Sequence, residues 1–337
     1  MSFVTLAEIK KLSKTLLHDH LDGGLRPATL IDIAEEIAME LPSFVGEDLQ
    51  SKIFAACNEG DLEKYLKNFD YTIAAMQSRD HVIRIARECV EDLADDGVTY
   101  AEVRGAPELF TRGEMDLNGV IEATLIGYKE GMQSARAKGK NIEVRAILCA
   151  MRHENRSLEV AEAALKYRDK GVVGFDIAGP EKGFPASKHR AAFELLIKNN
   201  FPFTIHAGEA GPFEYIEEAI TSFKAPRIGH GVRLLDELSA NGNEVTLSDR
   251  AKLIRDIGVH IEMAPTSNLQ TGLARSYAEH PAALFQNLGF NVALNTDNRL
   301  MSATSLSEEY SRMSSAHGWS LEVVEEMNAK ALEAAFC

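Results

Sequence analysis

One short sequence pattern recurs along this 337-residue chain and constrains its fold more than any other feature. A polar helix end is followed by a glycine and then by a short run of β-branched or other apolar residues. A glycine at that point suits the left-handed position that ends many helices, and the run after it favours an extended strand. The pattern occurs five times, with its glycine at Gly97, Gly139, Gly171, Gly258 and Gly289. Each of them predicts a helix that leads into a strand.

Three further strands lack this glycine. One opens the chain at residues 15–20, and the other two follow Pro202 and Pro226. The eight predicted strands lie near residues 15–20, 98–104, 142–149, 172–178, 203–207, 226–230, 259–264 and 291–296. Helical patterns separate them, and eight βα units predict an α/β protein of the (β/α)8, or TIM, barrel type. A doubly wound open sheet is the alternative, but no G-x-G-x-x-G follows the first strand and no Walker motif occurs.

Two stretches fall outside the repeated pattern. Residues 29–95 carry helical periodicity without a clear strand, and residues 320–335 have the pattern of a C-terminal helix. We therefore expect extra helices between strands 1 and 2, over about residues 29–95, and at the C-terminus. Single α/β barrels commonly reach this length, so we expect one domain that spans residues 1–337.

The composition limits the kinds of partner. The formal net charge is −15 and the basic residues form no cluster, so no nucleic-acid partner is expected. A membrane span needs a run of ~18 apolar residues, and the sequence contains none. The start of the chain lacks the apolar core of a signal peptide, and the four scattered cysteines form no C-x-x-C. We expect a cytoplasmic protein whose partner is a small molecule, with an oligomeric state that the sequence leaves open.

The first predicted strand ends in alternating polar side chains. Residues two apart on a strand project from the same face, so His18 and His20 direct two imidazoles toward one point. Asp22 continues the same alternation before Gly23 and Gly24 end the strand. Alone, two such histidines are more simply explained as unrelated surface residues.

Ionisable residues also end other predicted strands, and the active sites of such barrels lie at the carboxyl ends of their strands. His206 ends the fifth strand and Asp297 ends the eighth. Singly, His206 would be a core histidine and Asp297 a helix N-cap. Together with His18 and His20 they favour a metal site, best suited to Zn²⁺, with Fe²⁺, Co²⁺ and Mn²⁺ as alternatives. Bound zinc lowers the pKa of water to ~7 and so supplies hydroxide at neutral pH.

Two further residues at these strand ends suit acid–base chemistry. Glu209 lies three residues after His206, and it is either a first-turn acid of a helix or a proton donor to a substrate. His230 lies between Gly229 and Gly231, where it would either hydrogen-bond to a ligand of the metal or orient or deprotonate a water.

In order and spacing, these segments resemble those of the adenosine deaminases, a family of metal-dependent hydrolases. The resemblance is carried by His18-Asp-His20-Leu-Asp22-Gly23, Gly174-Phe-Asp-Ile-Ala-Gly179, His206-Ala-Gly-Glu209, Gly229-His230-Gly231 and Asn295-Thr-Asp297. It extends over nearly the whole chain and implies the same barrel. It also implies a zinc-dependent enzyme that converts adenosine, and 2′-deoxyadenosine, to inosine and ammonia.

The resemblance further implies roles for single residues. One Zn²⁺ per chain would be held by His18, His20, His206 and Asp297. Glu209 would protonate purine N1, His230 would act on the attacking water or on the oxygen that forms, and Asp297 would hold that water. The residues that would contact the purine nucleoside are His20, Asp22 at a ribose hydroxyl, Gly179 at N3 through its backbone N–H, and Asn298.

Asn298 departs from the family pattern. Many members have a second Asp there, assigned as a donor to purine N7, and Arg299-Leu300-Met301 replaces a more usual Pro-containing turn. An amide donates at any pH, whereas an Asp must first be protonated, so Asn298 is chemically competent.

The sequence leaves three alternatives open. The enzyme could be a sister deaminase that acts on adenine, or one that acts on a 5′-modified adenosine such as aminodeoxyfutalosine. The chain could also be a non-catalytic purine-binding barrel, because fold alone does not define function. A binuclear amidohydrolase is not expected, since residues 172–179 lack the lysine that bridges two metals there.

Overall fold

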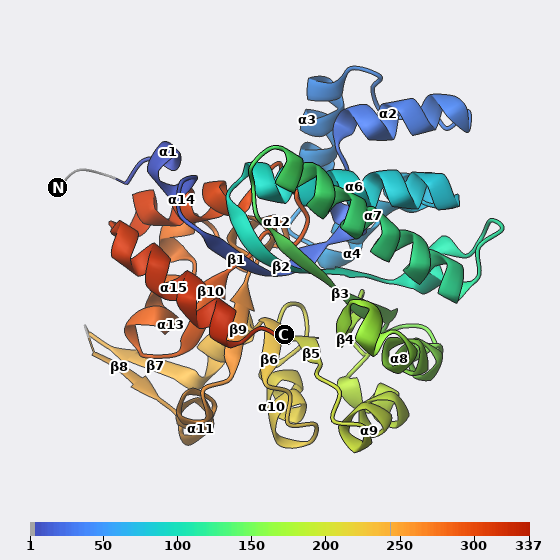
Figure 1. Cartoon of the computed structure of the whole chain (residues 1–337). Coiled ribbons are helices and arrows are strands. Elements are labelled where there is room, and N and C mark those ends of the chain that lie inside the picture. The colour runs from blue at the N-terminus through green and yellow to red at the C-terminus, as the bar shows by residue number, and fades with distance from the viewer. Residues whose placement is uncertain (1–3, 243) are drawn as a thin grey trace.

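The computed structural model describes residues 4–242 and 244–337, and parallel strands form its centre (Figure 1). Eight of the described strands pair in two parallel sets of four. The first set, in the order of pairing, is β1 (Lys14–His20), β2 (Val98–Gly105), β3 (Glu143–Met151) and β4 (Val172–Ala178). The second set is β5 (Thr204–Ala207), β6 (Arg227–His230), β9 (His260–Met263) and β10 (Asn291–Leu294).

Backbone contacts join the two sets at both seams. Phe175 of β4 forms a parallel bridge with Phe203, and Asp19 of β1 forms one with Asp297, just beyond β10. At the second seam the Asp297 N–H donates to the His18 carbonyl at 2.9 Å, and the His20 N–H donates to the Asp297 carbonyl at 2.7 Å. The sheet therefore closes on itself, which confirms the predicted (β/α)8 barrel.

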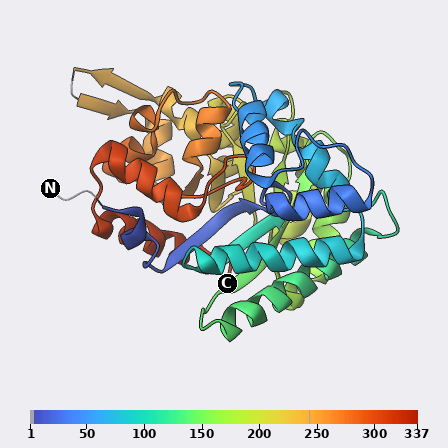
Figure 2. The same ribbon diagram turned by 90° about the horizontal axis from the view of Figure 1, so that it is seen from above.

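Helices surround the sheet. They are α6 (Arg79–Asp95), α7 (Leu117–Ala137), α8 (Ser157–Lys166), α9 (Arg190–Lys198), α10 (Phe213–Thr221), α11 (Asp249–Ile257), α13 (Ala282–Asn287), α14 (Leu306–His317) and α15 (Leu321–Glu333). The helix α6 shows the pattern: its stripe of Val82, Ile85, Cys89 and Leu93 is buried, and α6 and α7 lie side by side (Figure 2). Burial of each large apolar side chain stabilises the fold by roughly 1.5–3 kcal/mol.

Four additional helices lie between β1 and α6, within the stretch where extra helices were predicted. They are α2 (Pro27–Glu36), α3 (Gly46–Cys57), α4 (Leu62–Leu66) and α5 (Phe69–Ala75). One cluster of buried apolar side chains runs from these helices, through Leu49 and Ile53, into the barrel core at Leu16. From this continuity we propose that the helices and the barrel form a single domain over the described residues.

Two features differ from what the local pattern predicts. Strand β1 ends at His20, and Asp22 lies in a 3-10 turn over Leu21–Gly23 rather than continuing the strand alternation. After β6, the strands β7 (Leu238–Asn241) and β8 (Glu244–Leu247) form an antiparallel hairpin outside the barrel. Within the described part of the chain, no helix combines the length and the apolar character needed to cross a lipid bilayer.

Candidate active site

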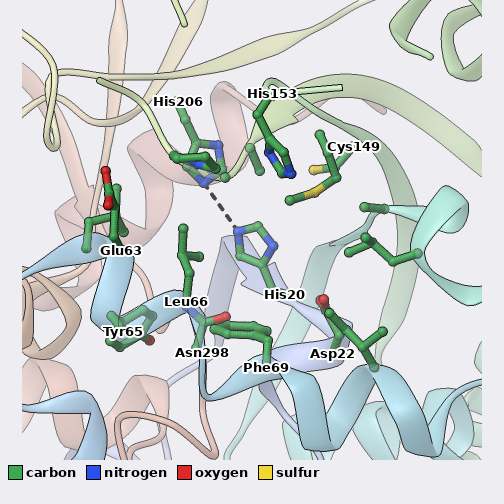
Figure 3. Close-up of a pocket in the computed structure, with 18 of the residues that line it drawn as sticks. His20, Asp22, Glu63, Tyr65, Leu66, Phe69, Cys149, His153, His206 and Asn298 are labelled. Carbon is green, nitrogen blue, oxygen red and sulfur yellow. Dashed lines mark hydrogen bonds between the residues drawn. The ribbon is translucent and has the colours of Figure 1, made fainter. Parts of the chain in front are cut away.

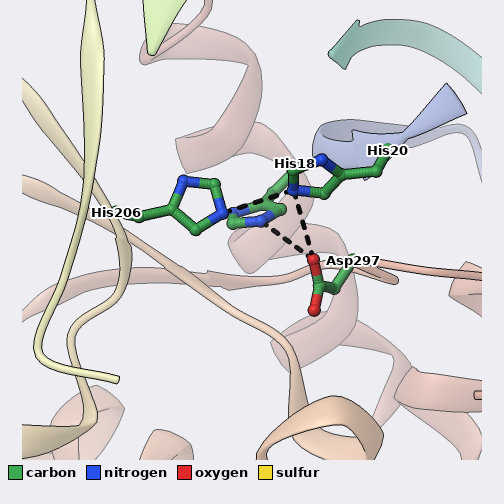
Figure 4. A group of neighbouring side chains, drawn as sticks. All are labelled: His18, His20, His206 and Asp297. Carbon is green, nitrogen blue, oxygen red and sulfur yellow. Dashed lines mark hydrogen bonds and ion pairs between the residues drawn. The ribbon is translucent and has the colours of Figure 1, made fainter. Parts of the chain in front are cut away.

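Three histidines and one aspartate meet at the carboxyl ends of the strands (Figure 4). Oδ1 of Asp297 lies 3.2 Å from Nε2 of His18 and 3.4 Å from Nε2 of His20. Nε2 of His20 lies 3.3 Å from Nε2 of His206. One ligand atom from each of the four residues lies within 4.8 Å of the others. The structure thus brings together the four residues that the sequence singled out, although they come from β1, β5 and the end of β10.

Backbone geometry explains why the cluster forms. Asp297 has a left-handed φ of 58°, which turns the chain out of β10 while its backbone still pairs with β1. The Ser267 hydroxyl donates to Asp297 Oδ2 at 2.6 Å and so fixes the carboxylate. The His18 ring packs against Gly229, where an added Cβ would come within 2.9 Å of the ring. Gly229 of β6, in the Gly-His-Gly segment, therefore makes room for the His18 ring, which comes from β1.

Two buried carboxylates accept hydrogen bonds from imidazole Nδ1 atoms, on the side of each ring away from the cluster. Glu262 Oε2 lies 3.1 Å from His18 Nδ1, and Asp176 Oδ2 lies 2.8 Å from His206 Nδ1. Because a carboxylate accepts, each Nδ1 carries the proton and each Nε2 lone pair faces the cluster. Arg104 joins the two carboxylates, at 2.6 Å from Asp176 and 2.8 Å from Glu262. The sequence analysis assigned no role to these three residues, although each is a charged residue within a strand of mostly apolar neighbours.

The electrostatics of the cluster suit a divalent cation. Burial lowers the pKa of His20 well below its ordinary value and also lowers that of His206, so both imidazoles are neutral ligands near pH 7. Burial opposes ionisation of Asp297, but contact with His18 holds the pKa of this carboxyl well below its usual range. Nε2 of His18 is buried and has no hydrogen-bond partner of good geometry among the described residues. Burial opposes protonation of His18, but contact with Asp297 and Glu262 outweighs it and raises the pKa of this ring, so a cation would displace a proton from it. Three imidazoles and one carboxylate form the donor set of a zinc-type site.

A cavity of about 610 Å³ opens beside this cluster (Figure 3). On the barrel side its wall contains the other residues that the sequence singled out: Asp22, Gly179, Glu209, His230 and Asn298. On the opposite side, α4 and α5 contribute the apolar side chains Leu62, Leu66, Phe69 and Ile73. Burial raises the pKa of Asp22 to about 7, and the charges of Asp297 and Asp19 add to this shift.

Hydrogen bonds fix the tautomer of His230. The Ala282 N–H donates to Nδ1 of His280 at 3.3 Å, so His280 carries its proton on Nε2 and donates to Asn268 Oδ1 at 3.1 Å. The Asn268 amide nitrogen then donates to Nδ1 of His230 at 3.0 Å. Burial lowers the pKa of His230 well below its ordinary value, so the ring is neutral. Its single proton therefore sits on Nε2, which lies 3.7 Å from Glu209 Oε2.

Glu209 keeps its proton because of where the loop after β5 places it. The side chain is buried, which raises its pKa well above the ordinary value, and the negative charges of Asp297 and Glu181 raise it further. Glu181 also shapes the loop, since its carboxylate accepts three backbone N–H bonds, from Gly208 at 2.7 Å, Glu209 at 2.9 Å and Gly211 at 2.6 Å. Nothing in the local sequence marks Glu181 as special, because only the folded loop shows which N–H groups it satisfies.

The fold and the site define a class: a (β/α)8 barrel with a metal-type cluster of three histidines and one aspartate at its carboxyl rim, beside a cavity that contains a buried acid. Comparison with known proteins narrows this class. Residues 13–337 match the family model described as "Adenosine deaminase". The chain belongs to the adenosine deaminase family, as the sequence motifs predicted.

Individual relatives agree with this assignment. An adenosine deaminase of Mycolicibacterium vanbaalenii is 48% identical over 336 residues, which cover 99% of this chain and 92% of the relative. Adenosine deaminase 1 of Streptomyces coelicolor is 47% identical, over 97% of this chain and 83% of the relative. Among solved structures, the N6-mAMP deaminase of Arabidopsis has a TM-score of 0.82 at 28% identity, with 98% of this chain and 95% of that chain covered.

Proposed function

We propose that this protein is a zinc-dependent enzyme that hydrolyses adenosine, and 2′-deoxyadenosine, to inosine and ammonia. One observation carries the proposal: a buried glutamic acid, Glu209, faces the same cavity as the His/Asp cluster. An acid with a raised pKa beside a site for a metal is what hydrolytic deamination of a purine needs. The relatives at 47–48% identity, named adenosine deaminases, support this choice of substrate.

The proposed zinc site consists of His18, His20, His206 and Asp297, with one ion per chain. When bound, zinc supplies a Lewis acid that makes water nucleophilic near pH 7. The Asp297 carboxylate, fixed by Ser267, would hold that water through a hydrogen bond. Because its only proton sits on Nε2, His230 would donate to the water oxygen and orient it rather than remove its proton.

Glu209 would be the proton donor to the substrate. Transfer of its proton to purine N1 would withdraw electrons from C6, and the oxygen of water would add there. One proton of the water would complete the ammonia that leaves and the other would return to Glu209, so that C6=O replaces the bond to the amino nitrogen and the π bond to N1. Burial keeps this acid protonated, and the bonds from three backbone N–H groups to Glu181 hold the loop that carries it.

The remaining wall residues would bind the nucleoside. The backbone N–H of Gly179 is proposed as the donor to N3, Asp22 and His20 as partners of the ribose, and Asn298 as the donor to N7. Asp22 supports a ribosylated substrate, because one of its buried carboxyl oxygens has no hydrogen-bond partner among the described residues.

A substrate panel tests the proposal. Purified enzyme loaded with one zinc ion should release ammonia from adenosine and 2′-deoxyadenosine faster than from adenine or from 5′-substituted adenosines. A higher kcat/KM for adenine would show that the ribose contacts are not used. Binding of adenosine without turnover would instead indicate a purine-binding barrel.

A further inference from the structure

Two buried polar atoms on different elements of the cavity wall have no hydrogen-bond partner among the described residues. They are the Tyr65 hydroxyl, on the helix α4, and Oδ1 of Asn298, on the barrel rim. The two residues are only 2% and 3% exposed, so water cannot readily satisfy either group. A buried polar atom without a hydrogen bond costs free energy, and such atoms in a binding site point to a bond that forms in the complex.

The packing of Asn298 places the oxygen and the NH2 group of its side-chain amide in different surroundings. A Cβ added at Gly23 would overlap Asn298 Oδ1, so the amide oxygen packs against the bare Cα of this glycine. The backbone is fixed as well, since the Asn298 N–H donates to the Thr296 carbonyl at 2.7 Å. With the oxygen at the wall, the NH2 end of the amide is the end available to a ligand.

The Tyr65 hydroxyl is the candidate hydrogen-bond donor to Asn298 Oδ1. Both side chains line the cavity, and Figure 3 shows them in the same part of its wall. Burial raises the pKa of the Tyr65 phenol well above its ordinary value, so the hydroxyl keeps its proton. The side chains of Ser302 and Asn298 oppose this shift, so these two are the candidate partners of the phenol. The Ser302 hydroxyl already donates to Gln270 at 2.8 Å, whereas Asn298 Oδ1 has no donor among the described residues.

We propose that Tyr65 is a positioning residue for Asn298: in the substrate complex its O–H donates to Asn298 Oδ1 and holds the amide with its NH2 toward the purine. An amide can rotate by half a turn and present an acceptor instead of a donor. A donated bond from the tyrosine hydroxyl to Oδ1 would favour the orientation with the NH2 toward the ligand. The inference rests on the proposed function, since it assumes that Asn298 donates to N7 of a purine nucleoside.

A double-mutant cycle tests the pairing. The variants Tyr65→Phe, Asn298→Ala and the double variant are compared by kcat/KM for adenosine. Loss of one neutral hydrogen bond corresponds to about a tenfold decrease, which we expect for Tyr65→Phe in the natural background. In the Asn298→Ala background the same substitution should change kcat/KM less than about twofold, because the group that it orients is gone.

Inhibition by a substrate analogue distinguishes a role of Tyr65 in orienting Asn298 from a general role in the stability of the fold. In 7-deazaadenosine a C–H replaces N7, so its inhibition constant should be the same for the natural enzyme and for Tyr65→Phe. Tyr310→Phe is the matched control: this hydroxyl is also buried without a partner among the described residues, but it lies outside the cavity, and its removal should leave kcat/KM unchanged.

Three results would overturn the inference. In the first, Tyr65→Phe leaves kcat/KM for adenosine unchanged. In the second, it lowers kcat/KM as much in the Asn298→Ala background as in the natural enzyme. In the third, it weakens the binding of 7-deazaadenosine as strongly as it lowers kcat/KM for adenosine. The second result would indicate that the phenol bonds to Ser302 instead. Failure of the proposed function is distinguishable, because the natural enzyme would then not deaminate adenosine at all.

Discussion

The two walls of the cavity are built on different principles. On the barrel wall, hydrogen bonds run in continuous chains, from Arg104 through Asp176 to His206 and from Arg104 through Glu262 to His18. On the helical wall, α4 and α5 present mainly apolar side chains, and the Tyr65 hydroxyl among them has no partner among the described residues. The barrel therefore fixes the imidazoles of the cluster before a ligand arrives. The Tyr65 hydroxyl on the helical wall, like single oxygens of Asp22 and Asn298 at the rim, is left for a contact in the complex.

The energetics follow the same division. Removal of one partner from a buried ion pair typically costs 3–5 kcal/mol, so each residue of the barrel wall depends strongly on the others. The helices α4 and α5 are short, and isolated helices of this length are unstable in water. Their positions depend on packing against the barrel, so single substitutions there should alter substrate affinity more than chemistry.

The largest effect is expected for Asp297→Ala. This substitution removes the only anionic member of the proposed zinc site, so kcat/KM should fall at least ~10³-fold. Metal analysis should find far less than one zinc per chain, whereas Asp236→Ala, at an exposed surface ion pair, should retain metal and rate. Full zinc content with normal turnover would remove Asp297 from the site.

Glu209→Gln should be nearly as severe while leaving the metal in place. The amide has the same shape but cannot deliver a proton, and general acid catalysis contributes ~10²–10⁴-fold. In the natural enzyme the raised pKa of Glu209 predicts that the rate falls as pH rises through that pKa, because the proton to be transferred is then lost. A pH profile of kcat/KM measures this alkaline limb, and its persistence in Glu209→Gln would assign it to another group.

Glu181→Gln should have an intermediate effect. The substitution replaces one of the oxygens that accept three N–H bonds by an NH2 group, which disturbs the loop that carries Glu209. We expect kcat to fall roughly tenfold, a cost in line with the loss of one or two hydrogen bonds, with a smaller change in KM. Glu194→Gln, on the exposed face of α9, is the control. An unchanged kcat would show that the loop keeps its geometry without this carboxylate.

The smallest effect is expected for an apolar side chain of the helical wall. Leu66→Ala removes apolar contact area from the cavity but no reacting group. KM for adenosine should rise several-fold, in line with ~0.8 kcal/mol for each buried CH2, while kcat stays within about twofold of its natural value. If kcat falls as much as in Glu181→Gln, then the helical wall also positions the reacting groups, and the contrast between the two walls does not hold.

Much of the barrel could be predicted because its signals are local. A glycine such as Gly171 or Gly258 ends a helix whatever the rest of the fold does, and the β-branched run after it forms a strand. The predicted strand bounds accordingly lie within a few residues of the observed ones. The hairpin of β7 and β8 was missed, because its short strands pair with each other and lie outside the repeated unit.

The sequence by itself determined the barrel, the family and the identity of the residues at the strand ends, since each depends on short segments and their spacing. Only the tertiary structure decided that Asp176 and Glu262 hold the imidazoles, that Asp22 leaves the strand in a turn, and that Tyr65 and Asn298 line the same cavity. The reason is physical: a strand period or a helix cap is set by neighbours in sequence. The partner of a buried charge or hydroxyl is set by closure of the sheet and by the packing of helices far away in the chain.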